Sequence, residues 1–228
     1  APAEIVVTGG PDAVSDDVLA ELEEFTDGSV TRISGEDRYE TAAALSARFE
    51  SPDTVFVATG QDYPDALAAG AVAGATGAPV LLVRQNSVPG STRDALEALN
   101  PGSIVVIGGT DTITDTVVTA LGDYTDGEVT RVSGEDRYGT AAALSAGLTT
   151  SEFGFVATGQ DWPDALGAAA LAGHLDAPVL LVKEDSVPLV TTTELERLEP
   201  PHLRVVGGPD VVSDAVLEAL EALDYTDE

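Results

Sequence analysis

The chain repeats itself with a period of 99 residues. Residues 31–49 (TRISGEDRYETAAALSARF) agree with residues 130–148 at 15 of 19 positions, and residues 55–74 agree with residues 154–173 at 15 of 20. A shorter phrase, GG-x-D-x-[VI]-[ST]-D, occurs three times at the same spacing and begins at Gly9, Gly108 and Gly207. Such a regular repeat predicts tandem structural modules, because equivalent sequences fold into equivalent units.

Each period alternates short apolar runs with helical patterns. The runs are rich in β-branched residues and alternate little between apolar and polar, which is typical of parallel strands covered on both faces. In the first period the predicted strands cover residues 5–10, 30–35, 54–60 and 78–83. The predicted helices begin near Ser15, Asp37, Pro64 and Ser91. Short connections favour right-handed βα units. The predicted fold class is therefore α/β, with tandem small Rossmann-like modules, each a parallel sheet flanked by helices.

The period divides the chain into a leading βα unit at 1–28 and two repeat modules at 29–123 and 127–226. A first module at 1–100 fits the period equally well, and the sequence leaves open which strands share a sheet. The third helical pattern, ALAAGAVAGATG, has small side chains that suit close packing on its own sheet or against the next module. The chain reads as about two and a quarter periods of a longer array.

The charge of the chain is extreme and spread through every segment. There are 40 acidic and 10 basic residues, a formal net charge of −30, and a single lysine, Lys183. Without a basic surface, nucleic-acid binding is excluded as a function class, and no apolar run reaches the ~20 residues of a membrane-spanning helix. At about 1 M salt the Debye length is roughly 3 Å, so self-repulsion is screened while carboxylates keep the surface hydrated. The composition therefore predicts a protein of an extremely halophilic archaeon.

Four segments taken in order are similar to the cell wall-binding repeat 2 family. They are RISGEDRYETAAALS, VATGQDYPDALAAGAVAG, APVLLV and IVVIGGTDTITDTVVTAL. The resemblance covers nearly the whole chain, twice, and rests on the ordered set rather than on any one motif. It implies a secreted, non-catalytic module at the cell surface that binds an envelope glycan or a surface-layer glycoprotein non-covalently. Family members usually carry three copies around a pseudo-threefold axis, whereas this chain has two full copies.

Candidate ligand-binding residues follow the ends of two predicted strands in each copy, where ligands of open parallel sheets bind. An arginine and a tyrosine follow one strand, and two aspartates around an aromatic residue follow the next. The arginines are suited to an anionic or hydroxyl-rich polymer, and the aromatic residues to sugar rings. The predicted site residues are Arg38, Tyr39, Asp62, Tyr63 and Asp65 in the first copy and Arg137, Tyr138, Asp161, Trp162 and Asp164 in the second.

Each of these patterns also has a structural alternative. Arg38 and Arg137 can form an ion pair with an aspartate of their own copy and so clamp two loops together. The paired aspartates can cap a helix rather than hold a cation, and the aromatic residue between them can seal a core. Arg32 and Arg131 lie inside a predicted strand and favour a structural pair. The GG turns favour glycine at positive φ over phosphate binding.

No catalytic set is found in the sequence. Cysteine is absent, and the only histidines, His174 and His202, are neither paired nor repeated, whereas nucleophilic or zinc chemistry needs convergent groups. The sequence therefore predicts no enzyme activity, no metal and no cofactor. Two rival functions stay open. One is a structural repeat whose Ala/Gly helices build a homo-oligomer in place of a third repeat, and the other is a small-molecule-binding α/β enzyme.

Overall fold

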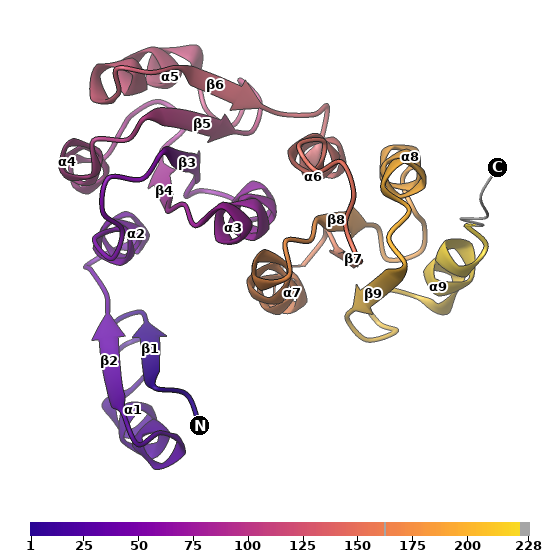
Figure 1. The fold of residues 1–228 in the computed structure, drawn as a ribbon, viewed down its shortest axis with the longest axis horizontal. Helices are drawn as coiled ribbons and strands as arrows, with labels where there is room; N and C mark the ends of the chain where they lie inside the picture. The colour runs from indigo at the N-terminus through magenta and orange to yellow at the C-terminus, as the bar shows by residue number, and fades with distance from the viewer. Residues whose placement is uncertain (162, 224–228) are drawn as a thin grey trace.

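Strands and helices alternate along the whole of the computed structural model, which describes residues 1–161 and 163–223. Two larger parallel sheets form the centres of the two modules, and a two-stranded parallel sheet precedes them (Figure 1). The predicted α/β fold class, with parallel sheets flanked by helices in repeated modules, is confirmed.

The first module is built on a four-stranded sheet with the order β4-β3-β5-β6. Its strands are β3 (Thr54–Thr59), β4 (Val80–Val83), β5 (Ser103–Ile107) and β6 (Val129–Val132). Its helices are α2 (Arg38–Ser46), α3 (Pro64–Thr76), α4 (Gly90–Leu99) and α5 (Asp115–Leu121). Leu96 of α4 and Val117 of α5 pack on one face of the sheet, while α3 packs on the other and α2 lies against α4 and β4.

The second module repeats this arrangement on a three-stranded sheet with the order β8-β7-β9. Its strands are β7 (Phe153–Thr158), β8 (Val179–Val182) and β9 (His202–Val206). Its helices are α6 (Arg137–Ser145), α7 (Pro163–His174), α8 (Leu189–Leu198) and α9 (Asp214–Glu221). Leu195 of α8 and Val216 of α9 pack on one face, and α7 packs on the other.

The leading unit has the same design as one part of the first module. Strand β1 (Glu4–Thr8), helix α1 (Asp16–Leu22) and strand β2 (Ser29–Ile33) correspond to β5, α5 and β6. Even the register agrees, since Ile5 lies opposite Val30 as Ile104 lies opposite Val129. The structure thereby decides which strands share a sheet: β5 and β6 join β3 and β4, so β6 belongs to the first sheet although it follows the predicted boundary at 123. The module boundaries otherwise stay a prediction.

Local contacts explain where strand β4 and helix α4 begin. Strand β4 begins at Val80 rather than at 78, because Ala78 donates its N–H to the Ala73 carbonyl (2.8 Å) at the end of α3. Helix α4 begins at Gly90 without a side-chain cap. Thr92, predicted near the cap, is buried and donates to the Leu82 carbonyl at 2.7 Å. Its hydroxyl therefore ties α4 to β4.

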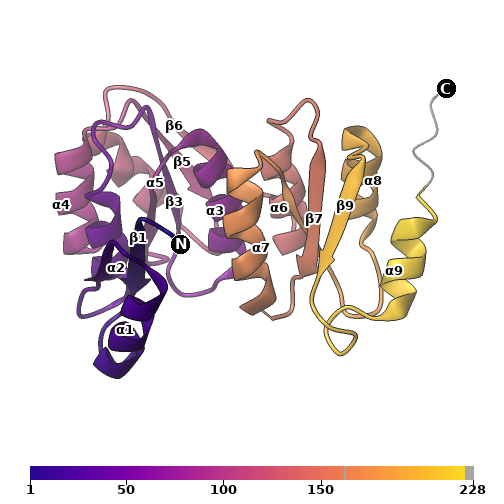
Figure 2. The same cartoon turned by 60° about the horizontal axis from the view of Figure 1, so that its bottom comes forward.

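Helices α3 and α7 lie side by side in both views of the fold, and we call their contact the module seam (Figures 1 and 2). A Cβ atom on Gly74 would lie only 3.0 Å from the Cα atom of Gly173. Small side chains continue this approach, and Ala68 and Ala71 of α3 share one buried cluster with Ala168 of α7. The Ala/Gly helix thus packs against the next module, which is one of its two predicted partners.

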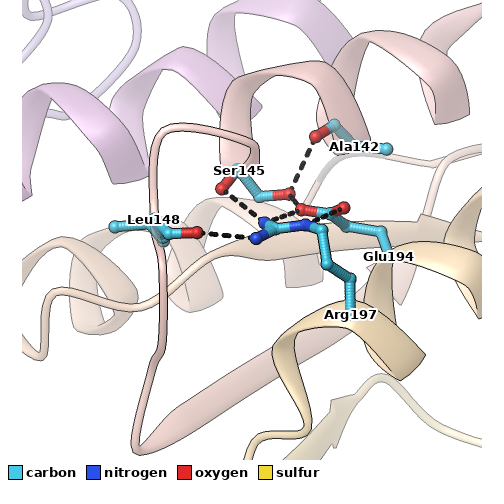
Figure 3. A network of polar contacts seen from close by, with 5 residues as sticks. All are labelled: Ala142, Ser145, Leu148, Glu194 and Arg197. Atoms are coloured by element: carbon cyan, nitrogen blue, oxygen red, sulfur yellow. Dashed lines mark hydrogen bonds and ion pairs between the residues drawn. The ribbon is translucent and has the colours of Figure 1, made fainter.

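A polar network joins α6 to α8 in the second module (Figure 3). The carboxylate of Glu194, only 8% exposed, receives the Nε and Nη2 hydrogens of Arg197 at 2.8 and 2.6 Å and the hydroxyl of Ser145. Arg197 also donates to the Leu148 carbonyl at 2.9 Å. Burial would raise the pKa of Glu194, but these hydrogen bonds and the Arg197 charge outweigh burial, so its pKa is lowered. The network is specific to this copy, because Ala95 and Ala98 hold the equivalent positions of the first.

Two of the predicted structural roles are confirmed. Arg32 pairs with Asp16 at 3.0 Å, and Arg131 pairs with Asp115 at 3.1 Å. The glycines that lead the GG turns have positive φ angles of 112° at Gly9, 108° at Gly108 and 127° at Gly207, a region that favours glycine. Within the described residues, no helix is both long and apolar enough to cross a bilayer.

Candidate ligand-binding site at the module seam

Helix starts place the predicted arginines at the carboxyl ends of the strands. The Asp37 carboxylate caps α2 by accepting the N–H groups of Tyr39 and Glu40, and Asp136 caps α6 by accepting that of Gly139. Each arginine is therefore the first residue of its helix. Arg38 Nη1 donates to the Gly60 carbonyl at 2.6 Å, and Arg137 Nη1 donates to the Gly159 carbonyl at 2.6 Å. The arginines thus tie each helix start to the end of the neighbouring strand.

The predicted site residues Tyr39 and Tyr138 directly follow these arginines in the sequence. Their side chains are buried, with 7% and 8% exposed. A Cβ atom on Gly60 would lie 2.6 Å from Cε1 of Tyr39, and one on Gly159 would lie 2.8 Å from Cε1 of Tyr138. Glycine is therefore required there, and the tyrosine rings form the floor of the strand ends.

The acid pair of the first copy stands at the start of α3. Asp62 Oδ1 accepts the N–H of Tyr63 at 2.9 Å, and Asp65 lies in the first turn of the helix, where Pro64 opens it as predicted. Asp65 is partly buried against Gly108, since a Cβ atom on that glycine would lie 2.6 Å from Asp65 Oδ2. Burial first, and the charge of Asp62 second, raise the pKa of Asp65, while Arg137 opposes them.

The arginine of one copy meets the acid pair of the other across the seam. Arg137 Nη2 lies 3.5 Å from Asp62 Oδ2, and the Tyr63 hydroxyl donates to the Gln160 carbonyl at 3.1 Å. The alternative prediction paired Arg137 with Asp161 or Asp164 of its own copy, whereas the observed ion pair joins Arg137 to Asp62 of the first copy. The cause is the packing of α6 and α7 on α3, which brings the start of α6 over the start of α3.

A hollow of about 460 Å³ lies between these groups. Its wall comes from the start of α3, the turn after β5 and the loop that leads into α6. The lining includes Asp62, Asp65, Thr110, Ser133, Arg137 and Thr140. Acids, hydroxyls and a guanidinium converge in it, so it offers hydrogen bonds to a polyhydroxy or charged ligand. No group of three or more His, Cys, Asp or Glu side chains is arranged to hold a metal ion within the described part of the chain.

Two further basic residues at the strand ends were missed by sequence reasoning. The Arg84 guanidinium lies 4.9 Å above the centre of the Tyr39 ring, and Lys183 Nζ lies 6.0 Å above that of Tyr138. The signal was present, because positions 84 and 183 are also 99 residues apart and are both basic in a chain that has few cations. Each copy therefore has two cations at the carboxyl edge of its sheet.

The aspartates of the second copy occupy places equivalent to those of Asp62 and Asp65. Asp164 is in the first turn of α7, and a Cβ atom on Gly207 would lie 3.2 Å from its Oδ2. Asp161 is exposed. The predicted residue Trp162 lies outside the described residues. The structure thus brings Arg137, Asp62, Tyr63 and Asp65 together at the seam, whereas Asp164 faces Gly207 of its own module.

Asp65→Asn is expected to stabilise the protein at neutral pH. The pKa of Asp65 is higher in the folded than in the unfolded state, so ionising this carboxyl is less favourable in the folded state. Above the folded pKa the ionised Asp65 therefore lowers the free energy of unfolding. That cost is lost as the pH falls toward the ordinary value of 3.8. Denaturant unfolding of both proteins at pH 7 and near pH 4 measures the effect. The gap should be present at pH 7 and close on acidification, and a less stable variant at pH 7 would contradict the assignment.

Tandem α/β modules that repeat the same basic residues at their strand ends define the class of tandem-repeat binding proteins. The family described as Cell wall binding domain 2 (CWB2) matches residues 32–118 and 131–217. The chain belongs to this family and is a cell wall-binding module.

Several known proteins are similar over most of the chain. The amidase enhancer of Bacillus subtilis (strain 168) is 30% identical over 186 residues, which are 81% of this chain and 25% of that protein. N-acetylmuramoyl-L-alanine amidase LytC of the same organism is 27% identical over 95% of this chain and 43% of its own length. The structure of Cwp6 from Clostridium difficile superposes with a TM-score of 0.87 at 23% identity, covering 97% of this chain and 36% of that one. The chain thus spans less than half of these relatives.

Proposed function

We propose that the chain attaches an extracellular protein to the cell surface by non-covalent binding of an envelope glycan or surface-layer glycoprotein at the carboxyl edges of its two sheets. The observation that carries the proposal is the contact of Arg137 with Asp62 across the seam, beside an open polar hollow. The contact holds a guanidinium at the opening of the hollow, where anionic or hydroxylated groups would be recognised. The family's description as a cell wall binding domain supports this role, as do the names of two relatives, an amidase enhancer and an N-acetylmuramoyl-L-alanine amidase.

The residues of the site divide into ligand contacts and supports. Arg38, Arg137, Arg84 and Lys183 are the ligand contacts, because they bring positive charge to the strand ends of a chain with net charge −30. Asp62 and Asp65 orient Arg137 and accept hydroxyl groups. The buried rings of the two tyrosines support the cations from below. The two modules each supply one edge, so one polymer can engage both and gain avidity.

Replacing Arg38 and Arg137 by alanine is expected to lower retention on isolated envelopes at least about tenfold, because each removes charge-assisted hydrogen bonds of about 1.5–3 kcal/mol. Co-sedimentation with envelopes of a halophilic archaeon in about 3 M NaCl measures the loss. The control is Arg48→Ala/Arg93→Ala, which removes the same charge from positions that contact Glu4 and the Val88 carbonyl. Equal retention of all three proteins would remove the arginines from the proposal.

The protein is expected to be stabilised by salt, since we propose that it works in a hypersaline medium. Its 40 carboxylates against 10 basic groups repel one another at low ionic strength, and this repulsion is screened as the Debye length falls. A thermal unfolding series from about 0.1 M to about 3 M NaCl should give a midpoint that rises throughout. A midpoint that is independent of salt would contradict the adaptation.

A further inference from the structure

We propose that β9 and α9 form an acceptor site for a β-strand of the pattern V-T-R-[VI]-S, supplied by another repeat of the same type. On one side β9 pairs with β7, and among the described residues no strand pairs with its other side. Figure 2 shows β9 and α9 at the end of the molecule far from the first module. This inference goes beyond wall binding and does not depend on it.

An apolar groove runs along this edge. It measures about 510 Å³ and is lined by Leu203, Val205, Leu217, Leu220, Glu221 and Leu223. Leu217 is 37% exposed, and Leu203 and Val205 are half-buried. The equivalent residues of β5, Ile104 and Val106, are 0% exposed, because β6 lies beside β5 and Val129 packs on the same cluster. The groove is therefore the place where a strand is seated in the first module.

The corresponding edges of β1 and β5 are each occupied by the same kind of strand. β2 (Ser29–Ile33, SVTRI) lies parallel to β1, with Val30 opposite Ile5 and Arg32 opposite Val7. β6 (Val129–Val132, VTRV) lies parallel to β5 in the equivalent register. Continuing that register places a valine opposite Leu203 and an arginine opposite Val205. Because side chains alternate along a strand, its first valine then points into the groove, on the same face as its arginine, as Val129 does in the first module.

In each occupied copy, the arginine of the added strand is received by a carbonyl of the GG turn, a second carbonyl before the next helix and an aspartate at that helix start. We call this set of acceptors the arginine socket, and it gives the edge its specificity. Arg131 donates to the carbonyls of Gly108 and Ile113, at 2.5 and 2.8 Å, and pairs with Asp115. Arg32 makes the corresponding contacts with Gly9, Val14 and Asp16. At the β9 edge the equivalent acceptors are Gly207, Val212 and Asp214.

The socket of β9 has the backbone shape of the two filled ones. The φ angle of its leading glycine is 127°, compared with 112° and 108°. The turn is closed by the same hydrogen bond, from Val212 N–H to the Gly208 carbonyl at 3.0 Å, as at Ile113 and Gly109. Two carbonyl acceptors are therefore held in place for a guanidinium, with Asp214 in the first turn of α9 beside them, so the expected occupant is an arginine-bearing strand rather than an unrelated apolar peptide.

The source to which we assign this strand is a further repeat, not a second copy of the described residues. In a second copy β2 already lies on its own β1, and its Arg32 already fills the socket of Gly9, Val14 and Asp16. Exchange between copies would have to break those contacts first. A repeat whose first strand has no such partner would bind without that loss.

The test is to fuse a copy of residues 128–135 (EVTRVSGE) after Glu228 and to follow hydrogen exchange of the fused chain. Seating of the added strand should slow exchange of alternate β9 amides at least about tenfold and raise the thermal midpoint. The same segment with its arginine replaced by alanine should give clearly less protection. A scrambled segment of the same composition should give none.

Three results would overturn the proposal. Exchange of β9 that is unchanged by the fused segment would show that the edge does not accept the strand. Equal protection by the scrambled segment would show that the arginine socket confers no specificity. Light scattering that finds the unfused protein dimeric, with β9 already protected, would show that a second copy is the occupant. Envelope retention is measured separately, so failure here leaves the wall-binding proposal untouched.

Discussion

Arg197→Ala is expected to lower the free energy of unfolding by about 2 kcal/mol, since it removes charge-assisted hydrogen bonds from a carboxylate whose side chain is only 10% exposed. The buried carboxylate of Glu194 would keep only its hydrogen bond from Ser145. The link from α8 to the Leu148 carbonyl would be lost as well. Chemical denaturation followed by circular dichroism measures the change.

The first module supplies the control for this change. It carries Ala95 and Ala98 where the second module carries Glu194 and Arg197, so Glu194→Ala/Arg197→Ala should recover most of the lost stability. The loss in Arg197→Ala should also shrink in acid. The pKa of Glu194 is lowered in the intact network, so that contribution is present above the ordinary value of 4.5 and is lost as the pH falls through the folded pKa. A double variant as unstable as the single one would refute the assigned role.

Gly173→Val is expected to cost about 3 kcal/mol and to separate the two modules, because the added side chain has no space at the seam. A Cβ atom at position 173 would lie 3.0 Å from Gly74 Cα and 3.1 Å from the Ala71 carbonyl oxygen, both backbone atoms that cannot turn aside. Calorimetry should show a broadened or double transition in place of a single one. Because Arg137 and Asp62 face each other across the seam, envelope retention should fall too.

The matched control lies on the same helix. A Cβ atom on Gly167 would meet nothing within 4 Å, so Gly167→Ala should be neutral or stabilising by roughly 0.5–1 kcal/mol, as for other helical glycines replaced by alanine. A Gly173→Val protein that unfolds like the Gly167→Ala protein would show that the seam does not depend on the close contact.

Much of the fold could be predicted from the sequence, because the features that specify it are local. The 99-residue period fixed the modular design, and continuous apolar runs between helical patterns indicated parallel sheets. Asp37 and Pro64 mark helix starts through chemistry within one turn, and the GG turns needed positive φ whatever surrounded them. Helix α4 begins within one residue of the predicted Ser91, but Thr92 does not cap it, because its hydroxyl bonds to a strand carbonyl instead.

The candidate site could be predicted only as a set of residues. The repeat identified Arg38, Arg137 and the acid pairs, and the same comparison would have found Arg84 and Lys183. It could not show that Arg137 meets Asp62 of the other copy, because their distance depends on how two modules pack. That packing is set by Gly74 and Gly173, which occupy the same position of the repeat in the two copies. The sequence does not indicate that these two glycines contact each other.

The sequence by itself determined the repeat, the α/β class, the strand-end positions of the site residues and the acidic surface, since each follows from neighbouring residues or from composition. Only the tertiary structure decided which strands share a sheet, which copy supplies each partner of an ion pair, and which sheet edge is uncovered among the described residues. Those outcomes depend on the orientation of one module against the next. Identical local sequences leave that orientation undetermined, and the close approach of two glycine-containing helices fixes it.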